Sequence, residues 1–154
     1  MLPPGVAGPP RLIVCERDGH WAVALRRELP SPGVRVYETR SVPQCWEMLA
    51  GHPASFVVAE LHPAHAKALL ERMVRLERDF PLVRVAVVAG RSLAGCEWLM
   101  RESGAVHFTC SPRQLGPLAR LACRHLDQAP KPPRDLIERL WESLPWRPSG
   151  DDER

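Results

Sequence analysis

The sequence predicts an α/β fold in which parallel strands form one sheet between two layers of helices. Two observations carry this prediction. Short apolar runs typical of buried strands alternate with amphipathic segments typical of helices, and the 17 prolines gather mainly near the two ends. Strands that alternate with helices in this way form parallel sheets with right-handed crossovers. The length of 154 residues fits one such domain with additional end segments.

Five segments have the apolar character of strands. The first, third and fourth are largely apolar, which indicates strands that are buried on both faces of a parallel sheet. The second alternates apolar and polar residues and is therefore expected near a sheet edge. The five strands are expected at residues 12–15, 34–37, 56–59, 83–88 and 106–109.

Five segments carry apolar residues at helical spacing. The third predicts one continuous helix whose apolar face is formed by Leu69, Leu70, Met73, Val74, Leu76 and Phe80. In the last helix Gly116 could act as a cap and Pro117 could occupy the first position, where proline is favoured. The helices are expected at residues 21–28, 42–49, 69–80, 94–101 and 118–126.

At this length the alternation best fits a flavodoxin-like doubly wound five-stranded parallel sheet of order 2-1-3-4-5, with a C-terminal helical tail. Ligand and reaction sites in such sheets lie at the carboxyl ends of the strands. The residues that follow the strands are therefore the candidates for chemistry, and they are Glu16, Arg17, Asp18, Glu60, Leu61, His62, Ala89, Gly90, Cys110, Ser111 and Pro112.

Proline-rich segments surround the domain, which is expected at residues 11–127. Residues 1–10 are expected to be a disordered leader, 128–134 a linker, 135–146 a short amphipathic helix and 147–154 a disordered tail. A helix of this length is marginal alone in water, so it is expected to dock on its own domain or on a partner. Its docking residues would be Leu136, Ile137, Leu140, Trp141, Leu144 and Trp146.

Composition excludes several classes of function. The net charge is only +3, with acidic residues interspersed, so nucleic acid is not an expected partner. No apolar run approaches the roughly 20 residues that span a membrane, and the N-terminus does not resemble a signal peptide. The five scattered cysteines indicate reduced thiols and a cytoplasmic location.

Four stretches carry a resemblance to response-regulator receiver domains, the phosphorylatable modules of two-component signalling. R-L-I-V-C-E-R-D-G resembles the first strand, which normally ends in acidic residues, and F-V-V-A-E-L-H-P resembles the third, which normally ends in the phospho-accepting Asp. V-V-A-G resembles the fourth strand with its switch Thr or Ser, and G-A-V-H-F-T-C-S-P resembles the fifth, where Lys precedes Pro. The resemblance covers about residues 11–126 and rests on spacing.

The residues that carry out the chemistry of the family are replaced in this chain. The family's acidic pair falls on Glu16 and Arg17, and its phospho-acceptor falls on Glu60. Its switch hydroxyl falls on Ala89, its aromatic switch residue on Phe108 and its Lys on Ser111. Receiver phosphorylation needs a carboxylate nucleophile and a cation held by oxygens, whereas an Arg side chain never loses its charge. The resemblance therefore implies a pseudo-receiver that keeps the fold without the phosphorylation cycle, with no enzymatic activity, cofactor or metal.

Two further hypotheses concern the strand ends. Arg17 and Glu60 could form an ion pair in which Glu60 imitates a phosphorylated Asp, although Glu60 could equally be a solvated loop carboxylate. Glu60, His62 and His65 have residue types that ligate metals, but three such residues in a short loop often arise by chance.

The expected function is that of a signalling or adaptor module that binds a protein partner without phosphorylation. The resemblance implies a dimer and effector surface on the fourth helix, fifth strand and fifth helix, for which the candidates are Trp98, Arg101, Phe108 and Arg120. Two alternatives remain open. One is a small-ligand-binding or enzymatic domain that uses the strand ends, and the other is an atypical phospho-accepting response regulator.

Overall fold

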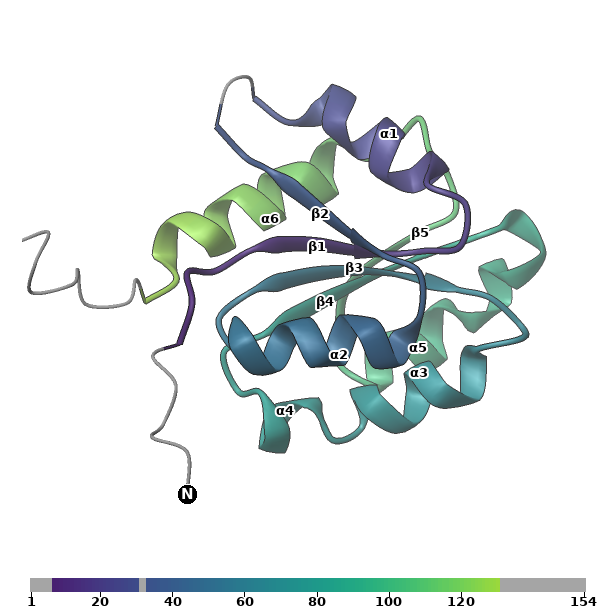
Figure 1. The fold of residues 1–154 in the computed structure, drawn as a ribbon. Coiled ribbons are helices and arrows are strands. Elements are labelled where there is room, and N and C mark those ends of the chain that lie inside the picture. Colours follow the sequence, from purple (N-terminus) through teal and green to yellow (C-terminus); the bar gives the residue numbers. More distant parts are fainter. Residues whose placement is uncertain (1–6, 31–32, 131–154) are drawn as a thin grey trace, which may run out of the picture.

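A computed structural model describes residues 7–30 and 33–130. At its centre lies a five-stranded sheet of order β2-β1-β3-β4-β5 (Figure 1). All neighbouring strands are parallel, so the predicted flavodoxin-like topology is confirmed. Edge strand β2 begins two residues later than predicted. The strands are β1 (Leu12–Cys15), β2 (Val36–Thr39), β3 (Phe56–Leu61), β4 (Arg84–Ala89) and β5 (Ala105–Thr109).

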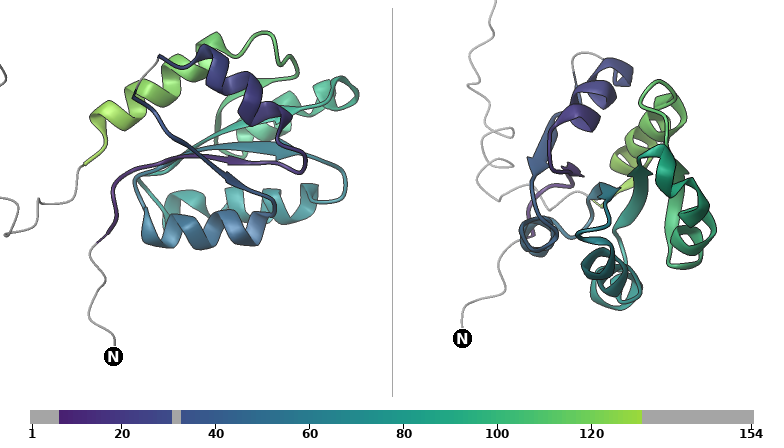
Figure 2. Two further views of the ribbon diagram at one scale, coloured as in Figure 1. Left: turned by 45° about the horizontal axis from the view of Figure 1, so that its top comes forward. Right: turned by 90° about the vertical axis from the view of Figure 1, so that its right-hand side faces the viewer.

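Helices cover both faces of the sheet (Figure 2). One apolar core lies beneath α1 (His20–Glu28) and α6 (Gly116–Gln128). A second core lies on the other face, beneath α2 (Val42–Gly51), α3 (Ala66–Met73), α4 (Leu76–Asp79) and α5 (Glu97–Glu102). A 3-10 helix, η1 (Arg91–Cys96), leads directly into α5.

The continuous helix predicted over residues 69–80 is wrong. The structure breaks it between α3 and α4, where Val74 is 65% exposed. Leu69, Met73 and Leu76 still reach the core as the spacing predicted. The break lets Leu76 approach the core from a second, shorter helix and turns Val74 toward solvent, so a single helical stripe could not describe both segments.

The described chain contacts α2 from Gly8, four residues before β1 begins at Leu12. Residues 7–10 were predicted to belong to a disordered leader, but Gly8 N donates a hydrogen bond of 2.8 Å to Gly51 O at the end of α2. His52 Nδ1 lies 2.8 Å from Pro9 O. These contacts fix the chain directly before β1. The amphipathic helix predicted at residues 135–146 and the tail at 147–154 lie outside the described residues.

All five cysteines are free, and Cys15 and Cys45 are buried in the core. No helix among the described residues is long and apolar enough to cross a membrane.

Candidate functional site

The carboxyl ends of β1 and β3 place charged side chains side by side. These strands are direct neighbours, and residues along each alternate between the two cores. Val14 and Val58 belong to the core beneath α1 and α6, so Glu16 and Glu60 continue on that face. The strand ends therefore direct both carboxylates toward the start of α1.

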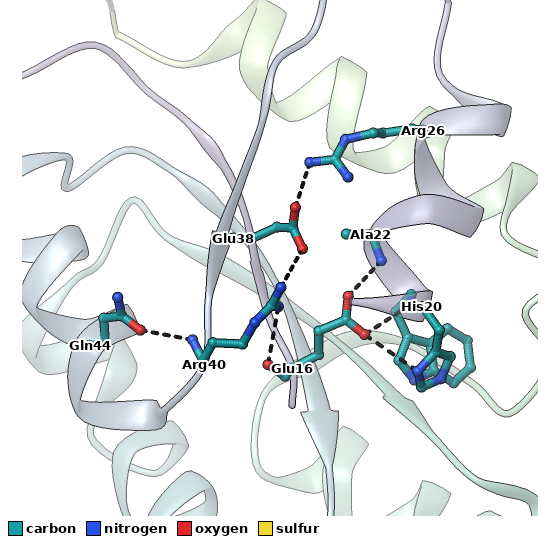
Figure 3. Close-up of polar contacts among 8 residues, drawn as sticks. Glu16, His20, Ala22, Arg26, Glu38, Arg40 and Gln44 are labelled. Atoms are coloured by element: carbon teal, nitrogen blue, oxygen red, sulfur yellow. Dashed lines mark hydrogen bonds and ion pairs between the residues drawn. The ribbon is translucent and has the colours of Figure 1, made fainter. Parts of the chain in front are cut away.

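Glu16 caps the N-terminus of α1 (Figure 3). Its Oε2 accepts a hydrogen bond of 2.8 Å from the backbone N–H of Trp21, and its Oε1 accepts one of 2.7 Å from Ala22. Glu16 is only 2% exposed, and a buried carboxylate is tolerated where it is hydrogen-bonded. The first N–H groups of a helix have no partner inside it, and the helix dipole favours a negative charge there. Glu16 thus holds α1 against the end of β1.

Gly19 makes this arrangement possible. It precedes α1 with a φ of 91°, a left-handed conformation that side chains disfavour, and it offers no capping side chain of its own. A Cβ at Gly19 would also lie 3.2 Å from Nη2 of Arg40. The turn therefore brings α1 back over Glu16 without steric conflict.

An ion-pair chain ties the same turn to edge strand β2 (Figure 3). Glu38 accepts a hydrogen bond of 2.8 Å from Arg26 on α1 and one of 3.0 Å from Arg40. The Arg26 and Arg40 guanidinium groups hold the pKa of Glu38 below its ordinary value. Arg40 Nη1 also lies 3.5 Å from the backbone oxygen of Glu16. The chain fixes α1 relative to the strand ends.

Glu60 is engaged by a tryptophan rather than by an arginine. The indole Nε1 of Trp21 donates a hydrogen bond of 3.1 Å to Glu60 Oε2. Trp21 is 3% exposed and packs in the core beneath α1, so its indole N–H is held in place. Glu60 is therefore partly covered and hydrogen-bonded from within the chain, not a freely solvated loop carboxylate.

The ion pair between Arg17 and Glu60, which the sequence left open, does not form in the structure. Nη1 of Arg17 lies instead 2.8 Å from Nε2 of His62, in the loop that follows β3. No ion pair joins Arg17 to a carboxylate within residues 7–30 and 33–130. The alternation of side chains explains the outcome, because Glu16 turns toward α1 and the following residue turns away from it.

A different set of residues from the predicted one could hold a metal ion. Donor atoms of Glu16, His20 and Glu60 all lie within 4.8 Å of one another, and in the described parts of the chain they form the one such group. Glu60, His62 and His65, whose residue types could ligate a metal, do not form such a group among the described residues. Both oxygens of Glu16 already accept backbone N–H groups, so only Glu60 is a carboxylate free to change partners. The site is therefore a poor match for Mg²⁺, which relies on oxygen ligands.

The remaining positions at the carboxyl ends of the strands supply no charged side chain. Ala89 is fully buried at the end of β4 and has no hydroxyl group. Ser111 follows β5 and is half-buried, and its backbone N–H donates a hydrogen bond of 3.2 Å to Thr109 Oγ1. Burial raises the pKa of the neighbouring Cys110 thiol, which disfavours the nucleophilic thiolate. Sequence reasoning identified these positions but missed His20 and Trp21, although the spacing of four residues between Glu16 and His20 was a usable signal.

The residues predicted for the switch and interaction surface lie on α5, on edge strand β5 and on α6. Trp98 on α5 is 72% exposed, and Leu99 beside it is 43% exposed. Arg101 is also on α5 and forms an ion pair of 3.0 Å with Glu97. Phe108, which falls on the family's aromatic switch position, is buried in the core. Arg120 lies along α6 near Gly116, a position that Glu28 of α1 also approaches, and is thus on the other face of the sheet.

An apolar groove lies beside the exposed Trp98 and Leu99. It has a volume of about 270 Å³ and opens between α3 and the η1–α5 segment. Its lining is almost entirely aliphatic, with Lys67 as its charged residue: Leu61, Pro63, Ala66, Lys67, Leu70, Leu93, Cys96, Leu99 and Met100. We call this the α3–α5 groove.

Comparison with solved structures shows the fold. A response regulator from Thermotoga maritima superimposes with a TM-score of 0.64 at 18% identity, covering 78% of this chain and 99% of that one. A response regulator receiver protein from Burkholderia phymatum gives 0.58 at 23% identity, covering 79% and 98%. An adenylate cyclase structure from Rhodopirellula baltica gives 0.58 at 16% identity, covering 88% and 99%.

The comparisons identify the fold of the chain but no sequence family. No protein-family model matches the chain, and no curated protein matches its sequence. The chain has the fold of response-regulator receiver domains, as the resemblance of its strand ends predicted.

Proposed function

We propose that this protein is a signalling module that keeps the receiver fold but binds a protein partner without being phosphorylated. One observation carries the proposal. Glu60 stands at the position of the family's phospho-acceptor, and its carboxylate is held by the indole N–H of the buried Trp21. Phosphoryl transfer to Glu60 would replace this charged acceptor by a neutral acyl oxygen and so weaken the hydrogen bond from Trp21.

The surroundings of Glu60 offer no compensation for a transferred phosphoryl group. Glu16 is committed to the N-terminus of α1, and Arg17 lies against His62. Neither the buried Ala89 nor Ser111 carries a charge that could neutralise phosphoryl oxygens. A single substitution would weaken the phosphorylation cycle, whereas this combination removes the cation site, the switch hydroxyl and the counter-charge together.

The exposed part of α5 is the surface we propose for the partner. Trp98 and Leu99 are both large, apolar and exposed, and Leu99 lines the α3–α5 groove. Tryptophan is enriched among residues that dominate binding energy, and exposed apolar patches mark interaction sites. Arg101 and Glu97 form a charged pair on the same helix, as expected at the rim of an interface.

A ligand-binding function is the second candidate, and the group formed by Glu16, His20 and Glu60 favours it. Its donor set of two carboxylates and one imidazole suits a transition metal such as Zn²⁺. A bound metal would draw Glu16 away from the first N–H groups of α1, so the two roles of Glu16 compete.

The Trp21 indole N–H provides a direct test of both candidates. Its proton NMR resonance, assigned with the variant Trp21→Phe, reports the hydrogen bond to Glu60. We expect no change on addition of beryllium fluoride with Mg²⁺, which imitates phosphorylation at an acceptor carboxylate. A shift with beryllium fluoride would contradict the proposal, and a shift with Zn²⁺ alone would favour the ligand-binding candidate.

Partner binding is tested by affinity capture from the native cell extract, followed by mass spectrometry. We expect Trp98→Ala to lose a captured protein that the wild type retains. Val23→Ala is the matched control, since Val23 is 49% exposed on α1, on the other face of the sheet. Equal capture by wild type and Trp98→Ala would exclude α5 as the surface.

A further inference from the structure

A second groove lies at the opposite end of the sheet, where the strands begin. It has a volume of about 500 Å³ and runs between α4, the start of β4 and the turn from α5 into β5. Its lining mixes apolar and charged residues: Met73, Val74, Leu76, Glu77, Pro81, Val83, Arg84, Glu102, Ser103, Gly104 and Val106. We call this the amino-end groove.

Two backbone irregularities turn apolar side chains toward this groove. The break between α3 and α4 leaves Val74 65% exposed. A register shift between β4 and β5 leaves Val106 as an extra residue, and its side chain is 37% exposed. Leu82, between two residues of the lining, is 47% exposed. Regular structure would pair or bury such positions, so the groove presents apolar surface that nothing in the described residues covers.

The described chain ends close to this groove. Near the end of α6, Nε2 of His125 lies 2.9 Å from Ala54 O, just before β3. The next residue, Ser55, accepts a hydrogen bond of 3.4 Å from the backbone N–H of Arg84, which lines the groove. In Figure 1, α4 and the end of α6 lie at the same end of the sheet. The end of α6 is therefore joined to the groove through Ala54 and Ser55, while α6 and α4 cover opposite faces of the sheet.

The segment that follows has the length and the pattern to fill the groove. Residues 129–134 can span about 20 Å when extended. The hydrogen bonds from His125 to Ala54 and from Arg84 to Ser55 link the end of α6 to the groove through one pair of neighbouring residues. Residues 135–146 then carry an amphipathic pattern whose apolar face is unaccounted for in the described domain: Leu136, Ile137, Leu140, Trp141 and Leu144. The α3–α5 groove lies at the far end of the strands, beyond the direct reach of this linker.

We propose that residues 135–146 bind intramolecularly in the amino-end groove and pack their apolar face against Val74, Val106 and Leu82. Docking in this way covers the apolar side chains that the helix break and the bulge expose. The α3–α5 groove at the opposite end then remains free for a partner. The inference does not depend on the proposed function, because it concerns the other end of the sheet.

Amide hydrogen exchange of the full chain, read by mass spectrometry, tests the inference. In the wild type we expect residues 135–146 to exchange at least about tenfold more slowly than an unstructured chain, since docking protects their amides. Leu140→Asp on the segment and Val74→Asp in the groove should each restore the unprotected rate. Arg139→Asp on the polar face and Val23→Asp on α1 are the matched controls and should leave the protection unchanged.

Three results would overturn the inference. Residues 135–146 could exchange at the unstructured rate in the wild type. Their protection could survive Val74→Asp, which would place them on another surface. Their protection could also fall on dilution, which would place them on a second copy of the chain. Exchange in β3 and β4 is recorded in every variant, so that unfolding of the domain is distinguished from release of the segment.

Discussion

The substitution Glu16→Ala tests whether Glu16 is a structural cap of α1. The side chain is 2% exposed, and it accepts two hydrogen bonds of 2.7 and 2.8 Å from backbone N–H groups. A hydrogen bond to a charged acceptor contributes about 1.5–3 kcal/mol, and losing a helix cap costs about 0.5–2 kcal/mol. Because water can reach the freed N–H groups once the side chain is shortened, we expect a loss of about 3 kcal/mol rather than the full sum.

The assay is urea-induced unfolding followed by circular dichroism, supported by thermal unfolding. A loss of about 3 kcal/mol corresponds to a fall in Tm of roughly 10 °C for a domain of this size. Glu47→Ala is the matched control, since it removes an exposed carboxylate on α2 and should change stability by less than about 0.5 kcal/mol.

Two results would refute the capping role. The first is a loss below about 1 kcal/mol, which is too small for a buried group with two charge-assisted hydrogen bonds. The second is a Tm of the wild type that rises with added divalent cation while that of Glu16→Ala does not. That dependence would show that Glu16 serves as a cation ligand.

Three further predictions concern Trp21, Glu38 and Trp98. Trp21→Phe removes the N–H that Glu60 accepts and should lower the free energy of unfolding by about 1 kcal/mol in a urea titration. Arg26 and Arg40 lower the pKa of Glu38 in the folded protein, so its stabilising contribution exists above its ordinary pKa of 4.5 and is lost as the pH falls below it. Glu38→Gln should therefore flatten the acid limb of a Tm-against-pH curve, and an unchanged limb would contradict this. Trp98→Ala should change stability by less than about 0.5 kcal/mol, because the side chain is 72% exposed, which separates any loss of partner binding from unfolding.

The fold was predictable because burial dictates the pattern of each strand. Apolar runs marked β1, β3 and β4 as interior strands, and the alternating β2 was correctly placed at an edge. The error over residues 69–80 arose because apolar residues at helical spacing indicate which side chains are buried. They do not indicate whether those side chains belong to one continuous helix or to two. Leu76 keeps the predicted burial on a separate helix, and the exposed Val74 marks the break.

The sequence predicted where the candidate site lies in the sheet, but not which of its side chains contact one another. Spacing identified Glu16, Arg17 and Glu60 as neighbours at the strand ends. The alternation of side chains would have indicated that Glu16 and Glu60 share a face while Arg17 does not. The hydrogen bond from Trp21 to Glu60 could not be inferred in the same way, because it depends on how α1 packs over β3 in three dimensions.

The contacts at the strand ends also bear on the proposed partner binding without phosphorylation. Glu16 binds the start of α1, Glu60 binds Trp21, and Arg17 contacts His62, so each charged group already has a partner inside the chain. Glu16 is buried, and a buried carboxylate without a partner is costly, whereas Glu60 is only partly buried and Arg17 is exposed. Because the N–H groups of α1 already supply a partner for Glu16, the proposal expects no change at this end of the sheet when a cation or a phosphoryl analogue is added. Any regulation of partner binding would then act elsewhere, on the exposed α5 surface or through the C-terminal segment, which is where variants should be sought first.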